Sequence, residues 1–227
     1  MKKYLIALLA VALCSCTFNV NTTSGKIVRC KGPIQEKTLE ELTGFNNIVV
    51  QGSADIFLVQ QPECKVTVRA NEEVFQYLDY VVEDGTLIIQ NKDRVNVAAE
   101  TYDITICLPS LSAITVNGAA DVKWISPYTS EDDMAIKVNG AGDLELGGVS
   151  VPSLSIVVNG AGDVDASSLD VDTLAITVNG AGDVLVSGVS DTAFFKVNGA
   201  GMIDARKLDC EAVETKRAGV AVIRLKD

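Results

Sequence analysis

The heptapeptide Val138-Asn139-Gly140-Ala141-Gly142-Asp143-Leu144 recurs, with small changes, along the second half of this 227-residue chain. The asparagines of its five copies are separated by 22, 20, 20 and 19 residues. A short stretch of the form Ile-x-Val or Phe-x-Val precedes each asparagine. A repeat of nearly constant length in this size range is typical of a solenoid or a repeat array.

The composition of the repeat decides which kind of solenoid it forms. Glycine costs about 1 kcal/mol at each helical position, so a helix that contains one or two glycines per copy is disfavoured. The Ile-x-Val alternation indicates short strands, and the glycines between them indicate bends. Two or three short strands per repeat predict an all-β fold, a parallel β-helix with coils of about 20 residues. A propeller blade would need about twice that length.

A related heptapeptide, Val50-Gln51-Gly52-Ser53-Ala54-Asp55-Ile56, lies earlier in the chain. Gln51 precedes Asn117 by 66 residues, which is three steps of 22 residues. Looser alternating stretches lie between the two. We therefore expect a β-helix head domain over residues 45–227, with irregular coils in 45–110 and regular coils in 111–227.

The first residues predict an export signal. Lys2 and Lys3 precede an apolar run over residues 4–13, which is too short to span a hydrocarbon core of about 30 Å. The run ends in Leu13-Cys14-Ser15-Cys16, which resembles the lipobox of bacterial lipoproteins and implies cleavage before Cys16 and lipidation of its sulfur. We expect residues 1–15 to be a lipoprotein signal peptide and residues 16–44 to be the lipidated cysteine followed by a linker.

Composition argues against several classes of function. The chain has 19 Lys and Arg against 30 Asp and Glu, a net charge of −11, and such an acidic surface repels the phosphates of nucleic acids. It has no histidine, which excludes Ser-His and Cys-His nucleophile pairs and every His-ligated metal site. We therefore expect a protein that is not an enzyme, needs no cofactor and binds no nucleic acid.

Four segments together carry a resemblance to a known family. They are the stretch Phe45-Asn46-Asn47-Ile48-Val49-Val50-Gln51-Gly52, the stretch Asp84-Gly85-Thr86-Leu87-Ile88-Ile89, the stretch Leu108-Pro109-Ser110-Leu111, and the repeated heptapeptides. In this order they resemble the "putative auto-transporter adhesin, head GIN domain" family over residues 45–227. The resemblance implies a single-stranded right-handed β-helix in a secreted or lipid-anchored protein of Gram-negative bacteria, and it brings no catalytic motif.

Fold, signal and resemblance predict a non-enzymatic lipoprotein of the cell envelope that acts as an adhesin-like or structural binding module. We expect the lipid on Cys16 to anchor the protein to the outer membrane, and we expect its ligand to be an envelope protein or a glycan. Two alternatives stay open, a carbohydrate-active enzyme on a β-helix scaffold and a Ca²⁺-stabilised scaffold.

The calcium alternative depends on a column of aspartates. One aspartate follows the glycines in four of the copies, and stacking would place these residues in a ladder: Asp121, Asp143, Asp163 and Asp183. The spacing departs from the calcium-binding β-roll repeat, in which an Asp follows Gly-x-Gly-x. We therefore favour a steric role for the glycines at tight bends, without metal. The asparagines should form a parallel structural ladder: Asn117, Asn139, Asn159, Asn179 and Asn198.

The enzyme alternative would need a cleft with carboxylates and a platform for a sugar. The roomiest insertion in the regular coils, residues 124–134, contains Trp124, Tyr128 and Asp132. These side chains are the candidate ligand-binding patch, although an aromatic cover over a coil corner explains them as well.

Four cysteines follow the predicted lipidation site: Cys30, Cys64, Cys107 and Cys210. They allow three full pairings, and the sequence does not select one. An exported protein can form disulfides. Cys64 and Cys210 also share the alternation of neighbouring apolar residues, which favours a role as small core side chains.

The lipidation hypothesis is testable by one substitution. Cys16→Ala should release the protein from membranes and abolish labelling with a radioactive or clickable fatty acid, because the acceptor sulfur is lost. Labelling that persists in the variant would refute the assignment of Cys16.

Overall fold

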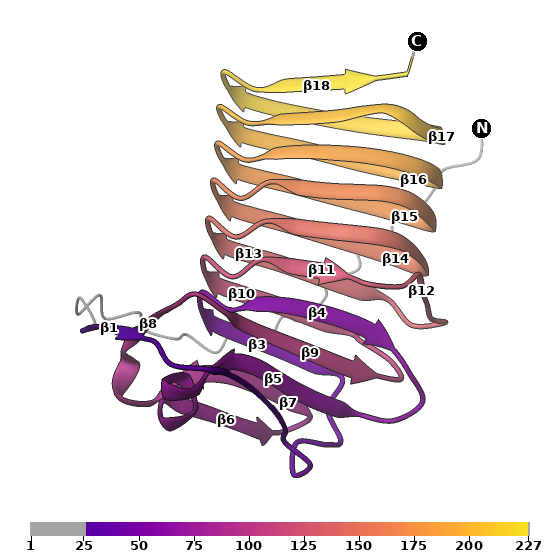
Figure 1. Cartoon of the computed structure of the whole chain (residues 1–227). Coiled ribbons are helices and arrows are strands. Elements are labelled where there is room, and N and C mark those ends of the chain that lie inside the picture. Colours follow the sequence, from indigo (N-terminus) through magenta and orange to yellow (C-terminus); the bar gives the residue numbers. More distant parts are fainter. Residues whose placement is uncertain (1–25, 227) are drawn as a thin grey trace.

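The computed structural model describes residues 26–226, and these form a parallel β-solenoid. About 71% of the described residues are in strands, and the solenoid makes about six turns with parallel strands about 20 residues apart, which confirms the predicted fold. Figure 1 shows the coils stacked along one axis, with the C-terminus at one end and β1, β5 and β6 at the other. The signal peptide and Cys16 lie outside the described residues.

The regular coils begin with short strands and continue with long strands that bend around the solenoid. The short strands are β10 (Ala113–Gly118), β11 (Val122–Trp124), β12 (Tyr128–Thr129) and β13 (Met134–Gly140). The later strands are β14 (Leu144–Gly160), β15 (Val164–Gly180), β16 (Asp183–Gly199), β17 (Met202–Gly219) and β18 (Val222–Leu225). Equivalent repeat positions pair, so that Asn159 lies between Asn139 and Asn179. The length of the sequence repeat is therefore the number of residues in one coil of the solenoid.

The N-terminal end, which we call the base, mixes parallel and antiparallel pairs. Its strands are β1 (Ile27–Cys30), β2 (Ile34–Thr38), β3 (Asn47–Gly52), β4 (Asp55–Gln60), β5 (Lys65–Asn71), β6 (Leu78–Glu83), β7 (Thr86–Asn91), β8 (Asn96–Ala99) and β9 (Tyr102–Leu108). Two 3₁₀ turns, η1 (Glu72–Gln76) and η2 (Lys92–Arg94), lie among them. Within residues 26–226, no helix is long and apolar enough to cross a membrane.

The base corrects the expectation that residues 45–110 form successive coils. Gln51 pairs directly with Asn117, although 66 residues separate them in the sequence. On its other side β3 pairs with β7, and β4 lies between β9 and β11. β3 and β4 thus form the second layer of the stack, although they come before β7 and β9 in the sequence. β7 and β9 form the first layer, and the regular coils follow β9. Antiparallel strands β2, β5 and β6 cover this end.

Part of the expected linker is folded. β1 pairs in parallel with β8, and β2 pairs antiparallel with β5. The side-chain amide of Asn71 supports this region: Nδ2 donates to the carbonyl of Gly32, and Oδ1 accepts from the amides of Glu100 and Thr101. The domain that the structure describes therefore begins before residue 45, because the segment after residue 26 supplies strands to the base.

The interior is one apolar core along the whole stack. The Ile-x-Val residues point inward, and Ile156, Val158 and Ile176 are fully buried. Alternate residues of a strand point to opposite faces, so the intervening residues face outward. Stacking of identical or similar aliphatic side chains fills the interior from coil to coil.

The thiols of the described residues are all free. Cys30 and Cys107 are buried, and Cys64 and Cys210 are half-buried against the core. Burial raises the pKa of the Cys30 and Cys107 thiols. The cysteines thus serve as small apolar side chains in this structure.

The glycine bends bring neighbouring coils very close together. A Cβ atom on Gly160, whose φ is +153°, would lie 1.9 Å from the carbonyl oxygen of Gly140. At Gly85, whose φ is +71°, the nearest atom would be Asn46 Oδ1 at 3.7 Å. Gly160 is therefore required both by its backbone conformation and by the lack of room for a Cβ atom, whereas Gly85 is required by its backbone conformation alone.

This comparison predicts different losses for two alanine variants. Gly85→Ala should lower the free energy of unfolding by about 1–2 kcal/mol, the usual cost of a positive φ. Gly160→Ala should cost more than about 3 kcal/mol, because the coils must also move apart. Urea denaturation of both variants measures the difference, and equal losses would contradict the close approach of the coils.

Candidate functional site

The stacked coils carry outward-facing side chains in columns beside the glycine bend. Phe57, Lys123, Glu145 and Asp165 occupy equivalent positions on β4, β11, β14 and β15. A shallow groove of about 430 Å³ follows this column, and we call it the acidic groove. It is lined by Asp55, Ile56, Phe57, Asp121, Val122, Lys123, Asp143, Leu144, Glu145, Asp163 and Asp165.

Negative charge dominates the acidic groove. Six of its lining residues are acidic and only one, Lys123, is basic. Lys123 Nζ lies 2.6 Å from Glu145 Oε2, and both side chains are about half exposed. The groove therefore attracts cations and groups that donate hydrogen bonds.

Crowding of carboxylates changes the titration of Asp55. Burial raises the pKa of its carboxyl group, and the neighbouring charges of Asp121 and Asp103 raise it further. Because the pKa is raised in the folded state, ionisation of Asp55 opposes folding as the pH rises through that pKa. A cationic ligand in the groove would relieve this repulsion.

The aspartate column is a hydrogen-bonded ladder. The backbone N–H groups of Asp143, Asp163 and Asp183 each donate to Oδ1 of the aspartate one coil earlier, at 2.8–2.9 Å. The backbone N–H of Met202 donates to Asp183 Oδ1 at 3.1 Å, so the last copy needs no aspartate of its own. Within residues 26–226, no group of three or more acidic, cysteine or histidine side chains is arranged to hold a metal ion.

The asparagine column forms a second ladder. Nδ2 of each asparagine from Asn139 onward donates to Oδ1 of the asparagine one coil earlier, at 2.7–2.8 Å. Each amide inside the column thus donates and accepts within it. This column links the coils and is a structural feature.

The structure corrects the expected sugar-binding patch. Trp124 and Tyr128 are buried, with exposed fractions of 4% and 2%. Tyr128 Oη accepts a hydrogen bond from the Leu111 amide and donates one to the Leu111 carbonyl. Asp132 is exposed, and its backbone N–H donates to Ser130 Oγ. Neither ring is available to stack on a sugar, because both fill the interior of the coil that contains β11 and β12.

The aromatic side chain that borders the acidic groove is Phe57, which the sequence analysis did not single out. It is half-buried and lies beside Lys123 in the outward column. The position of Phe57 could have been predicted from the sequence. Aligning the heptapeptide that contains Asp55 with the copy that contains Asp121 places Phe57 and Lys123 at the same repeat position.

The buried tyrosines of the base are structural. Tyr80 Oη and Tyr102 Oη are 2.6 Å apart, and the Tyr102 hydroxyl also donates to Asn91 Oδ1. Burial raises the pKa of Tyr102 to about 12 and that of Tyr80 well above its ordinary value. Both phenols stay protonated at neutral pH and hold β6 and β7 against β9.

The ladder geometry predicts how the aspartates respond to substitution. Replacing Asp143, Asp163 and Asp183 together with Asn should change the free energy of unfolding by less than about 1 kcal/mol, because Asn Oδ1 accepts the same N–H. The matching triple Ala variant should lose about 1–2 kcal/mol. Urea denaturation with Ca²⁺ or a chelator makes the comparison. A large stabilisation of the wild type by Ca²⁺ that both variants lose would establish the calcium scaffold instead.

Comparison with known proteins places the chain among adhesin-like proteins. Its fold resembles a solved structure titled putative adhesin from Parabacteroides distasonis ATCC 8503, with a TM-score of 0.81 and 23% identity over 87% of this chain and 84% of that one. A putative lipid binding protein from the same organism has a TM-score of 0.78 and 21% identity, over 88% of this chain and 100% of that one. A putative adhesin from Bacteroides fragilis NCTC 9343 has a TM-score of 0.71 and 17% identity, over 87% and 99%.

At these identities the solved structures show a shared fold. No curated protein matches the chain significantly. The family described as "putative auto-transporter adhesin, head GIN domain" matches residues 44–226. The chain therefore belongs to this adhesin-like family.

Proposed function

We propose that this protein is a non-enzymatic lipoprotein of the cell envelope that acts as an adhesin-like binding module. The acidic groove is the observation that supports a binding role, because it gathers six carboxylates around one lysine on an otherwise regular tube. The family assignment supports a place at the cell surface or in the envelope.

A cationic partner fits the groove best. Carboxylates accept hydrogen bonds from ammonium groups and form ion pairs with them, and Phe57 adds an apolar surface at the same place. A basic segment of an envelope protein and a glycan with amino groups both have this chemistry. Neutral or anionic ligands lack the charge that would offset the repulsion among the carboxylates.

The proposed anchor suits an exposed binding surface. A lipid on Cys16 would hold the protein in the outer membrane through the N-terminal end of the chain. The first described strand, β1, lies at the base, and the regular coils extend away from it (Figure 1). The acidic groove spans β4 to β15, so it would lie along the side of the solenoid, where partners can reach it.

One observation favours the carbohydrate-active alternative. A glycosidase uses a pair of carboxyl groups, of which the acid has a raised pKa, and burial and the charges of Asp121 and Asp103 raise the pKa of Asp55. An enzyme would lose turnover of oligosaccharides on Asp55→Asn, whereas a binding module shows no turnover in either form. The shallowness of the groove and the burial of Trp124 favour the binding module.

Removal of charge tests the proposal. Isothermal titration should show that the wild-type protein binds an oligolysine peptide or a chitosan oligosaccharide, and that added salt weakens binding. A variant with Asp143→Asn, Glu145→Gln, Asp163→Asn and Asp165→Asn should bind at least about tenfold more weakly, a loss of about 1.4 kcal/mol.

The control removes the same number of charges from exposed residues outside the groove. It carries Glu131→Gln, Asp170→Asn, Asp172→Asn and Asp191→Asn, and it should bind nearly as tightly as the wild type. Equal binding by the groove variant and the wild type would refute the groove as the binding surface.

A further inference from the structure

The C-terminal end of the solenoid, which we call the tip, leaves a strand edge open. β18 pairs with β17 only over Met202–Ala205. Among the described residues, no strand pairs with the outer edge of β17 over residues 207–219. An open edge of this length presents unpaired N–H and C=O groups to any strand that approaches.

The tip also exposes apolar side chains. Four of the ten large apolar side chains that are exposed within residues 26–226 lie on the last coil: Val213, Val220, Val222 and Leu225. The exposed fraction of Val213 is 39%, whereas Ala193, one coil below it, is fully buried. The interior that other coils cover therefore reaches solvent at the tip.

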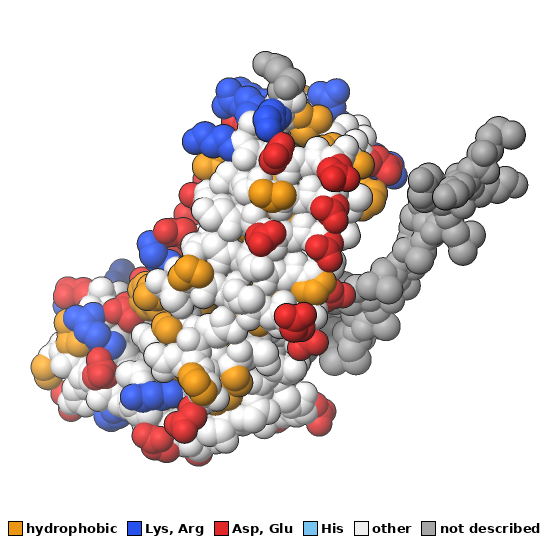
Figure 2. Space-filling view, turned by 90° about the vertical axis from the view of Figure 1, so that its right-hand side faces the viewer, with side chains coloured by type: hydrophobic (Ala, Val, Ile, Leu, Met, Phe, Trp, Pro, Cys, Tyr) orange, Lys and Arg blue, Asp and Glu red, His pale blue; other side chains and the backbone are white. Residues whose placement is uncertain are grey.

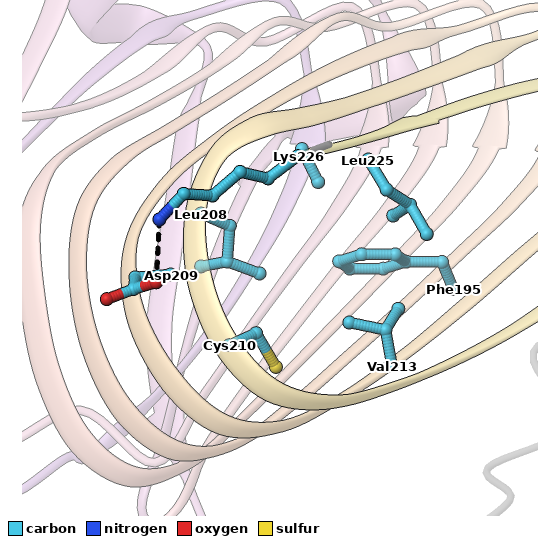
Figure 3. A pocket seen from close by; sticks show the side chains of 8 residues that line it. Phe195, Leu208, Asp209, Cys210, Val213, Leu225 and Lys226 are labelled. Atoms are coloured by element: carbon cyan, nitrogen blue, oxygen red, sulfur yellow. Dashed lines mark hydrogen bonds and ion pairs between the residues drawn. The ribbon is translucent and has the colours of Figure 1, made fainter.

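A cavity of about 280 Å³ lies at the tip, where the apolar interior is exposed. Figure 3 shows Phe195, Leu208, Val213 and Leu225 around it, with Lys226 reaching across to Asp209. Lys226 Nζ lies 2.8 Å from Asp209 Oδ1. The cavity is the space that the core side chains of one more coil would fill.

Charges restrict what can cover the tip. Arg217 occupies the register position of the buried Val197, and Lys216 occupies the outward position beside it. Charged side chains at an edge disfavour pairing with an arbitrary strand. A suitable partner must offer a carboxylate opposite Lys216.

A second copy of this chain offers that carboxylate. Glu214 and Lys216 flank Thr215 and point outward, and Lys216 Nζ lies 3.0 Å from Glu214 Oε1 in the single chain. If two β17 strands pair antiparallel about a two-fold axis at Thr215, Glu214 of each copy faces Lys216 of the other. Opposite charges directly across an antiparallel pair are stabilising.

The rest of the surface favours contact through the tip. Residues 111–201 contain twelve acidic residues and three lysines, so the sides of two solenoids repel each other. Residues 202–226 contain six Lys and Arg and four Asp and Glu, and Figure 2 shows Lys and Arg gathered at this end. Tip-to-tip contact also keeps the acidic coils of the two copies apart.

We propose that the tip is a homodimer interface in which the β17 strands of two copies pair antiparallel about Thr215. At the base the edge strands β2 and β6 are five and six residues long and run antiparallel to their neighbours, so they do not match the longer parallel edge of β17. The contact is therefore isologous and closes as a dimer, not as a fibre.

A charge exchange tests this interface. Sedimentation velocity of the purified protein over a range of concentrations should show a monomer–dimer equilibrium. Lys216→Glu and Glu214→Lys, each alone, should raise the dissociation constant by at least about tenfold, because each places like charges opposite one another. The double variant Glu214→Lys/Lys216→Glu should restore the wild-type constant. The exposed Glu214–Lys216 pair contributes little to folding, and circular dichroism verifies that each variant is folded.

The Lys123–Glu145 ion pair provides the matched control. The same single and double exchanges there should leave the dissociation constant unchanged, because this pair lies on the side of the solenoid. A wild-type protein that stays monomeric up to about 1 mM would overturn the proposal. A dimer that is insensitive to the Glu214 and Lys216 exchanges would overturn it as well.

Discussion

The close approach of neighbouring coils at the glycine bends is the constraint on which the rest of this structure depends. At Gly160 the carbonyl oxygen of the preceding coil occupies the place where a Cβ atom would be. Only glycine allows this contact, so its recurrence at each bend keeps successive coils in register. Register in turn stacks Ile upon Ile and Val upon Val in the interior, and it aligns the asparagine and aspartate ladders beside the bend. A single backbone requirement thus organises both the core and the surface columns.

The same regularity explains why the candidate binding surfaces are confined to a few places. Identical coils produce a smooth tube, and a smooth tube has no cleft in which reacting groups could be held away from water. The acidic groove arises where the base meets the regular coils, because β4 brings Asp55 and Phe57 beside a column that otherwise belongs to the repeats. The tip differs for the opposite reason, since no coil within residues 26–226 covers the outer edge of β17. Both candidate surfaces are therefore interruptions of the repeat.

The two surfaces also differ in charge, and this separates their roles. The groove is strongly acidic and runs along the side, where it favours a cationic partner. The tip carries both signs of charge around apolar side chains, which favours a self-complementary contact. A dimer joined through its tips would leave both grooves accessible and would place two bases at opposite ends. In this arrangement the proposed binding at the groove does not depend on the proposed association through the tip.

The sequence alone determined the solenoid, because its period and its Ile-x-Val alternation are local patterns that repeat from coil to coil. Pairing of like positions then follows, as in the alignment of Asn139 with Asn159. Only the tertiary structure decided the layout of the base, where β3 and β10 are neighbours across 66 residues and where β1 and β2 belong to the fold. It also decided that Trp124 and Tyr128 are buried and that Phe57 borders the groove. In the irregular coils no adjacent copy shows which way a side chain points. Its orientation depends on which distant strands pack together, and a local pattern does not contain that information.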